Sequence, residues 1–309
     1  MLEDSVELKD FLNELYPNLV ITDVAKKSGQ RVVYYGYFNT TSSPIDNEFA
    51  HVWGQIVLKV SEATSRAAIT YIQKEVEILK QIDHPSYPKL HYSEVITQDP
   101  FTEEPLSPIR FISVEERING VPLTNKMSSY KDEKSVIEFL IQTITIMDAI
   151  SGHSQKLVHR DLKPDNILVT DSGKIFIIDL GILREEGSSG VTNSLCSFGP
   201  CTPTYASPEQ AINDKSNITF KSDLFSLGVI AYEMLSGSNP FIEVGGDNYI
   251  DDVLHRVCSY TPSNLTSLGF DADLDKVISK MMNKEPYKRY RTPQKALDDL
   301  NEIKDKIWQ

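Results

Sequence analysis

The residues with the clearest chemical potential lie in one short run, His159-Arg160-Asp161-Leu162-Lys163-Pro164-Asp165-Asn166. Phosphoryl transfer to a hydroxyl group requires an acceptor for the hydroxyl proton, a cation near the transferring charge, and an oxygen ligand for a divalent metal ion. Asp161, Lys163 and Asn166 could supply these three groups from a single loop. The run therefore indicates phosphoryl-transfer chemistry.

The same run resembles the catalytic loop of eukaryotic-type (Hanks-type) Ser/Thr protein kinases. Lys163, two residues after the Asp, is typical of members that act on Ser and Thr. The resemblance implies that Asp161 and Lys163 are catalytic and that Asn166 is a metal ligand. It also implies a bilobal α+β fold, with ATP as the phosphate donor and protein Ser/Thr hydroxyls as acceptors.

A second motif, Asp179-Leu180-Gly181, follows the apolar strand predicted over Lys174–Ile178. It resembles the DFG element of the family, with Leu in place of Phe, a form that looks more bacterial than animal. Hard divalent cations prefer oxygen ligands, so the resemblance implies that Asp179 and Asn166 hold Mg²⁺, or Mn²⁺, against the phosphates of ATP. Alone, this tripeptide would indicate only the exit from a strand.

A lysine within an apolar strand is the third candidate. Val57-Leu58-Lys59-Val60 resembles the strand whose Lys holds the α- and β-phosphates, although a lysine here could also extend from a sheet edge to solvent. A helix predicted over Ala67–Ile82 follows it, and Glu75 stands where the family places the ion-pair partner of that Lys. Glu77 is the alternative, but it lies ~200° around the helix from Glu75, so we assign Glu75.

The phosphate-covering loop departs from the family pattern. Ser28 and Arg31 stand where two of the family's glycines are expected, and only Gly29 remains before Val33. Backbone N–H groups of such a turn could still bind phosphate, with Arg31 or Lys26-Lys27 adding charge. We therefore expect Ser28, Gly29, Arg31 and Val33 to contact the nucleotide.

The connector to the second half begins near Glu116. Alignment on Ile118-Asn119-Gly120 puts Glu115 at the gatekeeper position and Glu116 in the segment that would receive adenine. A shift of one residue would put Val114 at the gatekeeper position instead. A carboxylate at position 115 is unusual for the family and could reach Lys59 or the nucleotide.

A segment from Cys201 to Glu209 resembles the end of the activation loop. By this resemblance Thr202 contacts the catalytic Asp and Lys, Glu209 pairs with Arg289, and Asp223 braces the catalytic loop through its backbone.

Arg160 precedes the catalytic Asp, and in kinases with this Arg a phosphate commonly orders the activation loop. The hypothesis is autophosphorylation within the window that contains Ser188, Ser189, Thr192, Ser194 and Ser197. Alternatively, Glu185 and Glu186 satisfy Arg160 and keep the loop ordered.

Two kinds of element must position these residues. β-Branched and aromatic runs predict strands over Arg31–Phe38, Gln55–Val60 and Ile109–Val114, while Asn39–Asn47 and Gln98–Pro108 read as surface loops. Apolar periodicity predicts helices over residues 5–15, Ser135–Ser151, Asp223–Leu235, Asp251–Cys258, Leu274–Asn283 and Pro293–Trp308, and a hairpin of Ile167–Val169 with Lys174–Ile178. We expect an N-terminal helical extension (1–18), a β-rich lobe (19–117) and a helical lobe (118–309).

Composition narrows the partners. The net charge of -13 disfavours nucleic acid and anionic membranes, which require a basic surface. No apolar run or N-terminal leader indicates a membrane span, and the three cysteines fit a reducing cytoplasm. Histidine and cysteine spacing predicts no zinc-type site. Cys196 and Cys201 could form a redox switch, although two loop cysteines are more often simply small residues.

Two alternatives remain open. A pseudokinase acting as a scaffold is supported by the degraded glycine loop, but it gives no reason to keep Lys59, Glu75, Asp161, Asn166 and Asp179 together. A small-molecule phosphotransferase would resemble protein kinases around the catalytic Asp, but such enzymes lack a Ser207-Pro208-Glu209-like segment and its Arg partner.

Overall fold

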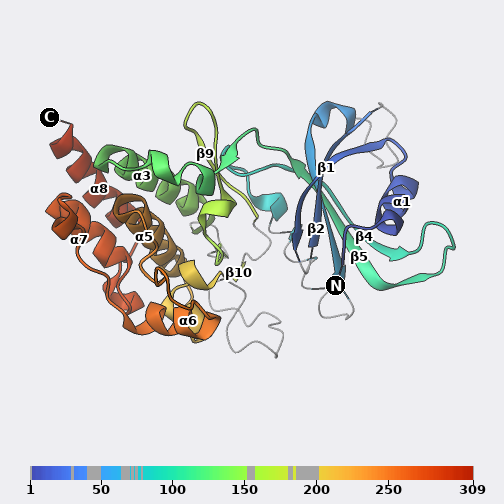
Figure 1. Ribbon diagram of the computed structural model, residues 1–309. Coiled ribbons are helices and arrows are strands. Elements are labelled where there is room, and N and C mark those ends of the chain that lie inside the picture. Colours follow the sequence, from blue (N-terminus) through green and yellow to red (C-terminus); the bar gives the residue numbers. More distant parts are fainter. Residues whose placement is uncertain are drawn as a thin grey trace. The chain divides into compact units, whose positions relative to one another are not determined.

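The computed structural model describes residues 2–28, 31–39, 50–63, 70, 73, 76–77, 79–151, 157–179, 184–185 and 202–308, with only the backbone at 26–28, 50, 184 and 185. The chain divides into two compact units, Met1–Asn119 and Gly120–Gln309 (Figure 1). Each unit is described separately below.

The small unit is built on a five-stranded antiparallel sheet of order β1-β2-β3-β5-β4. Its strands are β1 Leu19–Ser28, β2 Arg31–Phe38, β3 Ile56–Ala63, β4 Leu90–Gln98 and β5 Pro105–Glu116. Burial alternates along β2, because successive side chains of a strand point to opposite faces. One face carries buried apolar side chains, and Lys59 belongs to the other set of the alternation.

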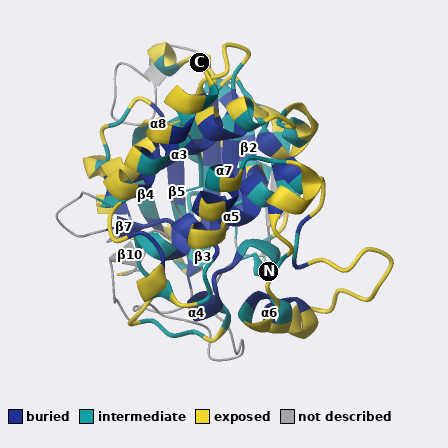
Figure 2. Ribbon diagram, turned by 90° about the vertical axis from the view of Figure 1, so that its left-hand side faces the viewer, coloured by how far each residue is buried: buried dark blue, intermediate teal, exposed yellow. Residues whose placement is uncertain are grey.

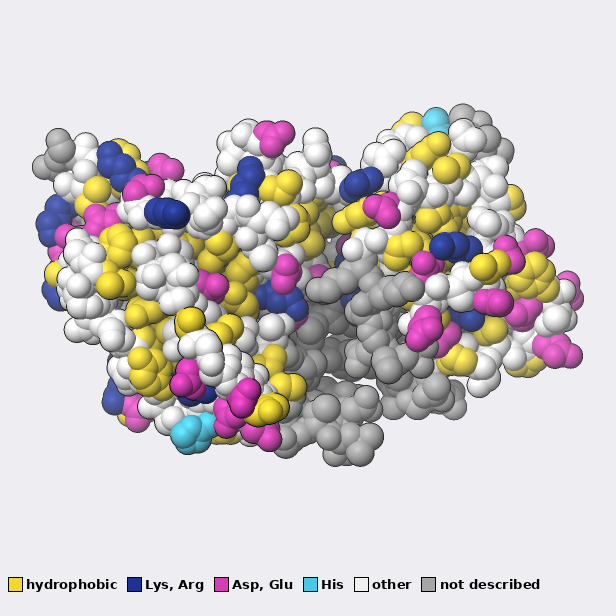
Figure 3. Space-filling view, in the orientation of Figure 1, with side chains coloured by type: hydrophobic (Ala, Val, Ile, Leu, Met, Phe, Trp, Pro, Cys, Tyr) yellow, Lys and Arg dark blue, Asp and Glu magenta, His cyan; other side chains and the backbone are white. Residues whose placement is uncertain are grey.

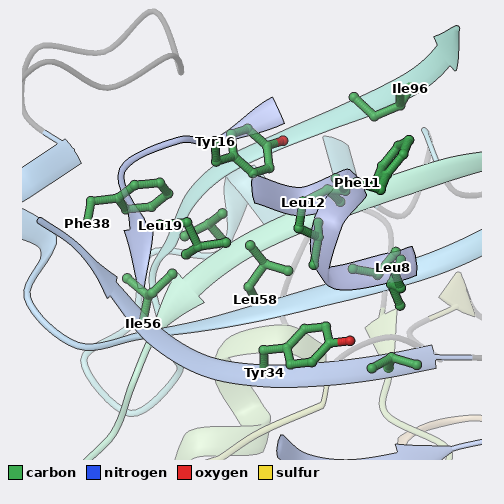
Figure 4. Packing of buried hydrophobic residues seen from close by; sticks show 14 residues of the cluster. Leu8, Phe11, Leu12, Tyr16, Leu19, Tyr34, Phe38, Ile56, Leu58 and Ile96 are labelled. Carbon is green, nitrogen blue, oxygen red and sulfur yellow. The ribbon is translucent and has the colours of Figure 1, made fainter. Parts of the chain in front are cut away.

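Helix α1, Val6–Leu15, covers the apolar face of this sheet. Ser5 caps the helix by accepting a hydrogen bond from the Leu8 amide at 3.2 Å. Leu8, Phe11 and Leu12 enter one buried cluster with side chains of β2, β3 and β5 (Figure 4). The Tyr34 hydroxyl donates to Asp4 Oδ1 at 2.8 Å, so a polar contact also ties the segment before α1 to strand β2.

The large unit is mainly helical. Its helices are α3 Glu133–Ser151, α4 Pro208–Ala211, α5 Phe220–Ser236, α6 Ile250–Ser259, α7 Ala272–Met281 and α8 Pro293–Ile307. Helix α5 is buried along most of its length (Figure 2). A Cβ at Gly228 of α5 would lie 2.8 Å from Met282 Cγ, so a larger residue here would require Met282 to shift.

The large unit also contains short strands, which flank its loops. They are β6 Val121–Pro122, β7 Leu157–Val158, β8 Ile167–Val169, β9 Ile175–Ile177 and β10 Arg184–Glu185. Strands β6, β8 and β9 form one sheet, and β7 pairs with β10. The turn between β8 and β9 contains Gly173 with φ +78°, a backbone conformation that favours glycine. No helix among the described residues is long and apolar enough to cross a membrane.

Most predicted elements are confirmed, including the α+β class, the helices of the large unit and the β8–β9 hairpin. The predicted loop Gln98–Pro108 is confirmed at residues 99–104, but it is shorter than predicted, because β4 extends through Gln98 and β5 already begins at Pro105. Proline is tolerated at the first residue of a strand. In the helix predicted over 67–82, residues 70, 73, 76, 77 and 79–81 are described and are helical. Except for Asn39, the predicted loop Asn39–Asn47 lies outside the described residues.

Candidate active site

The carboxylate of Asp161 is the centre of a hydrogen-bonded set in the large unit. Lys163 Nζ lies 2.8 Å from Asp161 Oδ2, and Asn166 Nδ2 donates to the same oxygen at 3.2 Å and to the Asp161 carbonyl at 2.8 Å. The short helical turn Pro164–Asn166 begins directly after Lys163 and ends at Asn166. The structure therefore brings together the three residues predicted from the catalytic run.

Thr202 joins this set from a distant part of the sequence. Its amide and its hydroxyl both donate to Asp161 Oδ1, at 2.9 and 2.8 Å. Lys163 Nζ also donates to Thr202 Oγ1 at 2.8 Å. Both carboxylate oxygens of Asp161 thus receive donors, which fixes the plane of the carboxylate.

Asn166 and Asp179 stand at the same end of the β8–β9 hairpin. Asn166 immediately precedes β8, Asp179 follows β9, and the Ile178 amide donates to the Asn166 carbonyl at 2.9 Å. The side-chain Nδ2 of Asn166 donates to Asp161. The side-chain oxygen of Asn166, Oδ1, is therefore the atom suited to a cation. Asp179 has φ +60°, in the left-handed region that Asp tolerates better than most residues. This pair of oxygen donors fits a hard divalent cation.

Asp223, at the start of α5, holds the backbone that leads into Asp161. Its carboxylate accepts from the amides of His159 and Arg160, each at 2.8 Å. Arg160 has φ +70°, which is uncommon for a residue other than glycine, and Gln210 Nε2 donates to its carbonyl at 2.7 Å. Burial raises the pKa of Asp223. The side chains of His159 and Arg160, and the hydrogen bonds from their backbone amides, oppose that shift.

The guanidinium group of Arg160 is buried and incompletely paired. Its Nε and Nη2 atoms find no hydrogen-bond partner among the described residues. Burial lowers the pKa of this group to about 10, and Asp223 opposes the shift. A buried cation with vacant donors is costly unless an acceptor reaches it.

An ion pair between Glu209 and Arg289 supports the end of the activation segment. Arg289 Nη1 and Nη2 donate to the two Glu209 oxygens at 2.7 and 2.9 Å, and both side chains are buried. Ser222 Oγ donates to Glu209 Oε1 at 2.6 Å. Sequence reasoning identified the pair but missed Ser222 and Gln210, since a polar residue in a helix carries no signal of a distant partner.

In the small unit, Lys59 contacts Glu115. Lys59 Nζ lies 2.8 Å from Glu115 Oε2, and both side chains are largely shielded from solvent. The contact between position 115 and Lys59 that the alignment suggested is therefore present. Glu116 instead accepts a hydrogen bond from the Lys89 amide at 3.3 Å.

The other predicted residues of the small unit are only partly described. Arg31 and Val33 lie on β2, where they pair with Ser61 and Lys59 of β3. Gly29, Glu75 and the side chain of Ser28 lie outside the described residues, as do the cysteines Cys196 and Cys201. Glu77 is exposed and pairs with Lys80 at 3.1 Å. The assignment of Glu75 as a partner of Lys59 stays a prediction.

Comparison with known proteins defines the class. Residues 50–300 match the family model described as protein kinase domain. The chain therefore belongs to the protein kinase family.

Among curated proteins, it is similar to the serine/threonine-protein kinase PknB of Mycobacterium tuberculosis, with 32% identity over 203 residues, covering 64% of this chain and 31% of the relative. It is also similar to a probable serine/threonine-protein kinase PknB of Lactococcus lactis, with 30% identity over 250 residues, covering 79% and 36%. The match to PknA of M. tuberculosis has 27% identity over 279 residues and covers 89% and 61%. The chain spans about a third of the length of the PknB relatives.

Proposed function

We propose that this chain is a Ser/Thr protein kinase that transfers the γ-phosphoryl group of Mg-ATP to protein Ser and Thr hydroxyls. The observation that carries the proposal is the hydrogen-bonded set of Asp161, Lys163 and Thr202 beside the oxygen donors Asn166 and Asp179. The names of the bacterial relatives, which are serine/threonine-protein kinases, support the same class of acceptor.

In this proposal Asp161 accepts the proton of the attacking hydroxyl. Thr202 holds Oδ1, while Lys163 and Asn166 hold Oδ2, so the carboxylate is oriented before substrate arrives. Lys163 also supplies positive charge near the transferring phosphoryl group. Preorganised charge of this kind stabilises a transition state without reorganisation during the reaction.

Asn166 and Asp179 would hold the divalent cation, and Lys59 would hold the α- and β-phosphates. A divalent cation held by Asn166 and Asp179 would supply positive charge against the charge that develops on the phosphate oxygens. Arg31 and Val33 on β2, with Ser28 and Gly29, would cover the phosphates in place of a full glycine-rich loop.

The decisive test is transfer of labelled phosphate from γ-labelled ATP to a peptide library with randomised flanks, followed by phosphoamino-acid analysis. The proposal expects phosphoserine or phosphothreonine that depends on Mg²⁺ or Mn²⁺. Phosphorylated aminosugars or small alcohols, with no labelled peptide, would instead favour the small-molecule phosphotransferase. Nucleotide binding without transfer would favour a pseudokinase, which no observation on the described residues supports.

Autophosphorylation near Arg160 is the second part of the proposal. The Nε and Nη2 donors of the buried Arg160, which have no partner among the described residues, suit a phosphate group, which adds ~1.5–2 negative charges and can accept several charge-assisted hydrogen bonds. The candidate acceptors between residues 188 and 197 lie outside the described residues. A phosphate there would order the segment by pairing with Arg160.

Mass spectrometry after incubation with Mg-ATP tests this part. A variant with Ala at Ser188, Ser189, Thr192, Ser194 and Ser197 should lose the modification and have a lower peptide-transfer rate. Unchanged activity together with no phosphate between 188 and 197 would contradict the autophosphorylation proposal and leave the kinase proposal intact.

We propose protein substrates rather than nucleic acid, because the net charge of -13 disfavours a polyanionic partner. On the face shown in Figure 3, acidic and basic side chains of described residues are interspersed rather than gathered into a basic stripe. Nucleic-acid binding would require such a stripe. We further propose that this domain works in the cytoplasm, where ATP is abundant.

A further inference from the structure

We propose that Glu115 is a positioning residue for the phosphate-binding Lys59, an inference that rests on the proposed kinase function. The 2.8 Å contact between Lys59 Nζ and Glu115 Oε2 is shielded, with side-chain exposures of 13% and 14%. A shielded ion pair is screened less by solvent and salt than an exposed one. The ion pair can therefore hold the Lys59 ammonium group in one position.

The sheet places Glu115 beside Lys59 rigidly. Lys59 is paired with Ser113 across β3 and β5, so Glu115 is two residues further along the same face of β5. The backbone of Glu115 is itself paired on both sides, with Val57 of β3 and Leu90 of β4. The backbone that carries the Glu115 carboxylate is therefore held by strand pairing on both sides.

The direction of this contact is specific. The β1–β2 turn, where we predict the phosphates to bind, lies beyond the pair Arg31–Ser61, whereas Glu115 is paired with Val57 on the other side of Lys59. Along β3, Lys59 thus lies between the end that leads to the predicted phosphate-binding turn and the end where Glu115 contacts it. An ammonium group has three N–H donors, so it can keep Glu115 and still bind phosphate.

Two consequences follow for Glu115. Its hydrogen bond orients the Lys59 ammonium toward the phosphates, and its charge offsets part of the attraction between Lys59 and ATP. Loss of Glu115 should therefore impair transfer without weakening nucleotide binding. The proposal requires Glu115 to be one partner of Lys59, not the only one.

The test is Glu115→Gln, which keeps the size of the side chain and removes its charge. We expect kcat to fall ~10-fold or more, since small misplacement of reacting groups is costly, while the dissociation constant for Mg-ATP stays level or falls. A kcat within about twofold of the unmodified protein would overturn the proposal. So would a clear rise in the dissociation constant at unchanged kcat, because Glu115 would then bind the nucleotide itself.

The matched control is Glu62→Gln. Glu62 pairs with Arg110 at 3.4 Å between the same two strands, β3 and β5, but away from Lys59. Its loss should leave kcat and the dissociation constant for Mg-ATP within about twofold. In the background of Lys59→Met, Glu115→Gln should leave the dissociation constant for Mg-ATP unchanged; a change there would show that Glu115 does not act through Lys59.

Chemical labelling separates failure of this inference from failure of the proposed function. Acetylation of lysines by an amine-reactive ester, read by mass spectrometry, should be several times faster at Lys59 in Glu115→Gln, because the amine loses its carboxylate partner. Lys80, which is 52% exposed, serves as the internal standard. An unchanged rate at Lys59 would overturn the inference even if the protein transferred no phosphate.

Discussion

The two units position their candidate catalytic groups in different ways. In the large unit, Asp161 is held by Lys163, Asn166 and Thr202, and the backbone before it is held by Asp223. In the small unit, Lys59 lies on a sheet whose opposite face is covered by apolar side chains of α1. The large unit relies on buried polar contacts, and the small unit relies on apolar packing with a charge on its other face.

The difference matches what each group must do. A proton acceptor works only at hydrogen-bonding distance from the group that it deprotonates, so its orientation requires several converging contacts. A phosphate-binding ammonium acts as a point charge, so a rigid strand and one shielded contact, that with Glu115, are enough to place it. Loss of a polar contact around Asp161 should therefore lower the rate of phosphate transfer, whereas loss of apolar packing under α1 should lower the free energy of unfolding.

The largest expected effect is that of Asp161→Asn on rate. Loss of the proton acceptor should lower kcat by ~10²–10⁴, the usual contribution of a positioned base. Nucleotide affinity and the far-UV spectrum should not change, because the Asn amide oxygen can still accept from the amide and hydroxyl of Thr202, although its NH₂ group cannot accept from Lys163. Single-turnover phosphate transfer measures the effect, and a variant with more than about half of the original rate would remove Asp161 from this role.

The next effect is on the stability of the large unit. Arg289→Ala leaves Glu209 buried without its partner, and this should lower the free energy of unfolding by ~3–5 kcal/mol. Urea denaturation of the whole chain, followed by α-helical circular dichroism, would measure the loss.

Lys288→Ala is the control for Arg289→Ala. Lys288 neighbours Arg289 but forms an exposed ion pair with Glu285, and its loss should not change the urea midpoint measurably. Equal losses for the two variants would mean that burial of the Glu209–Arg289 pair is unimportant.

The small unit should respond to loss of apolar volume. Leu12 is fully buried beneath the sheet, so Leu12→Ala should lower the free energy of unfolding by ~2–5 kcal/mol. Val6 is on the same helix but is 70% exposed, and Val6→Ala should change it by less than ~0.5 kcal/mol. If Leu12→Ala were as mild as Val6→Ala, α1 would not be part of the core.

The smallest expected effect is a change in pH dependence within the large unit. Burial lowers the pKa of Lys284 from 10.5 to about 8, and Lys284 Nζ donates to the Val257 carbonyl at 2.7 Å beside the rings of Phe225 and Phe241. Between these two pKa values the unfolded chain binds more protons, so the contribution of Lys284 to stability increases as pH rises from about 8 to 10.5.

Lys284→Met should remove this contribution, so the difference in unfolding free energy between the two proteins should change across that range. Lys280→Met is the control, because Lys280 also lies over an aromatic ring, that of Tyr290, but is 45% exposed. Parallel pH profiles for Lys284→Met and the original chain would contradict the assignment.

Sequence reasoning predicted the two halves unequally, for a physical reason. Asp161, Lys163 and Asn166 meet because they are neighbours in one loop, so a short run of residues already contains their geometry. The helices of the large unit have a clear apolar periodicity and were placed within a few residues. Strands β1 and β4 were not delimited, because the pairing that defines a strand edge is not visible in the strand itself.

Contacts across strands were harder to predict than contacts within a loop. The gatekeeper register depended on a one-residue choice between Val114 and Glu115, and only the pairing of β3 with β5 shows Glu115 next to Lys59. Ser222 and Gln210 were missed for the same reason: their partners, Glu209 and Arg160, come from other segments. The contact between Thr202 and Asp161 was expected only through the family resemblance.

Helix α1 has a consequence for how this family is delimited. The family match begins at residue 50, after α1, β1 and β2, yet Leu8, Phe11 and Leu12 share one core with strands on both sides of that boundary. A chain cut where the match to the family model begins would expose the apolar faces of β3 and β5 to water. The stretch that the family model matches is therefore shorter than the unit that packs together, and substitutions in the first sixteen residues should be constrained by the sheet that they cover rather than by the reaction.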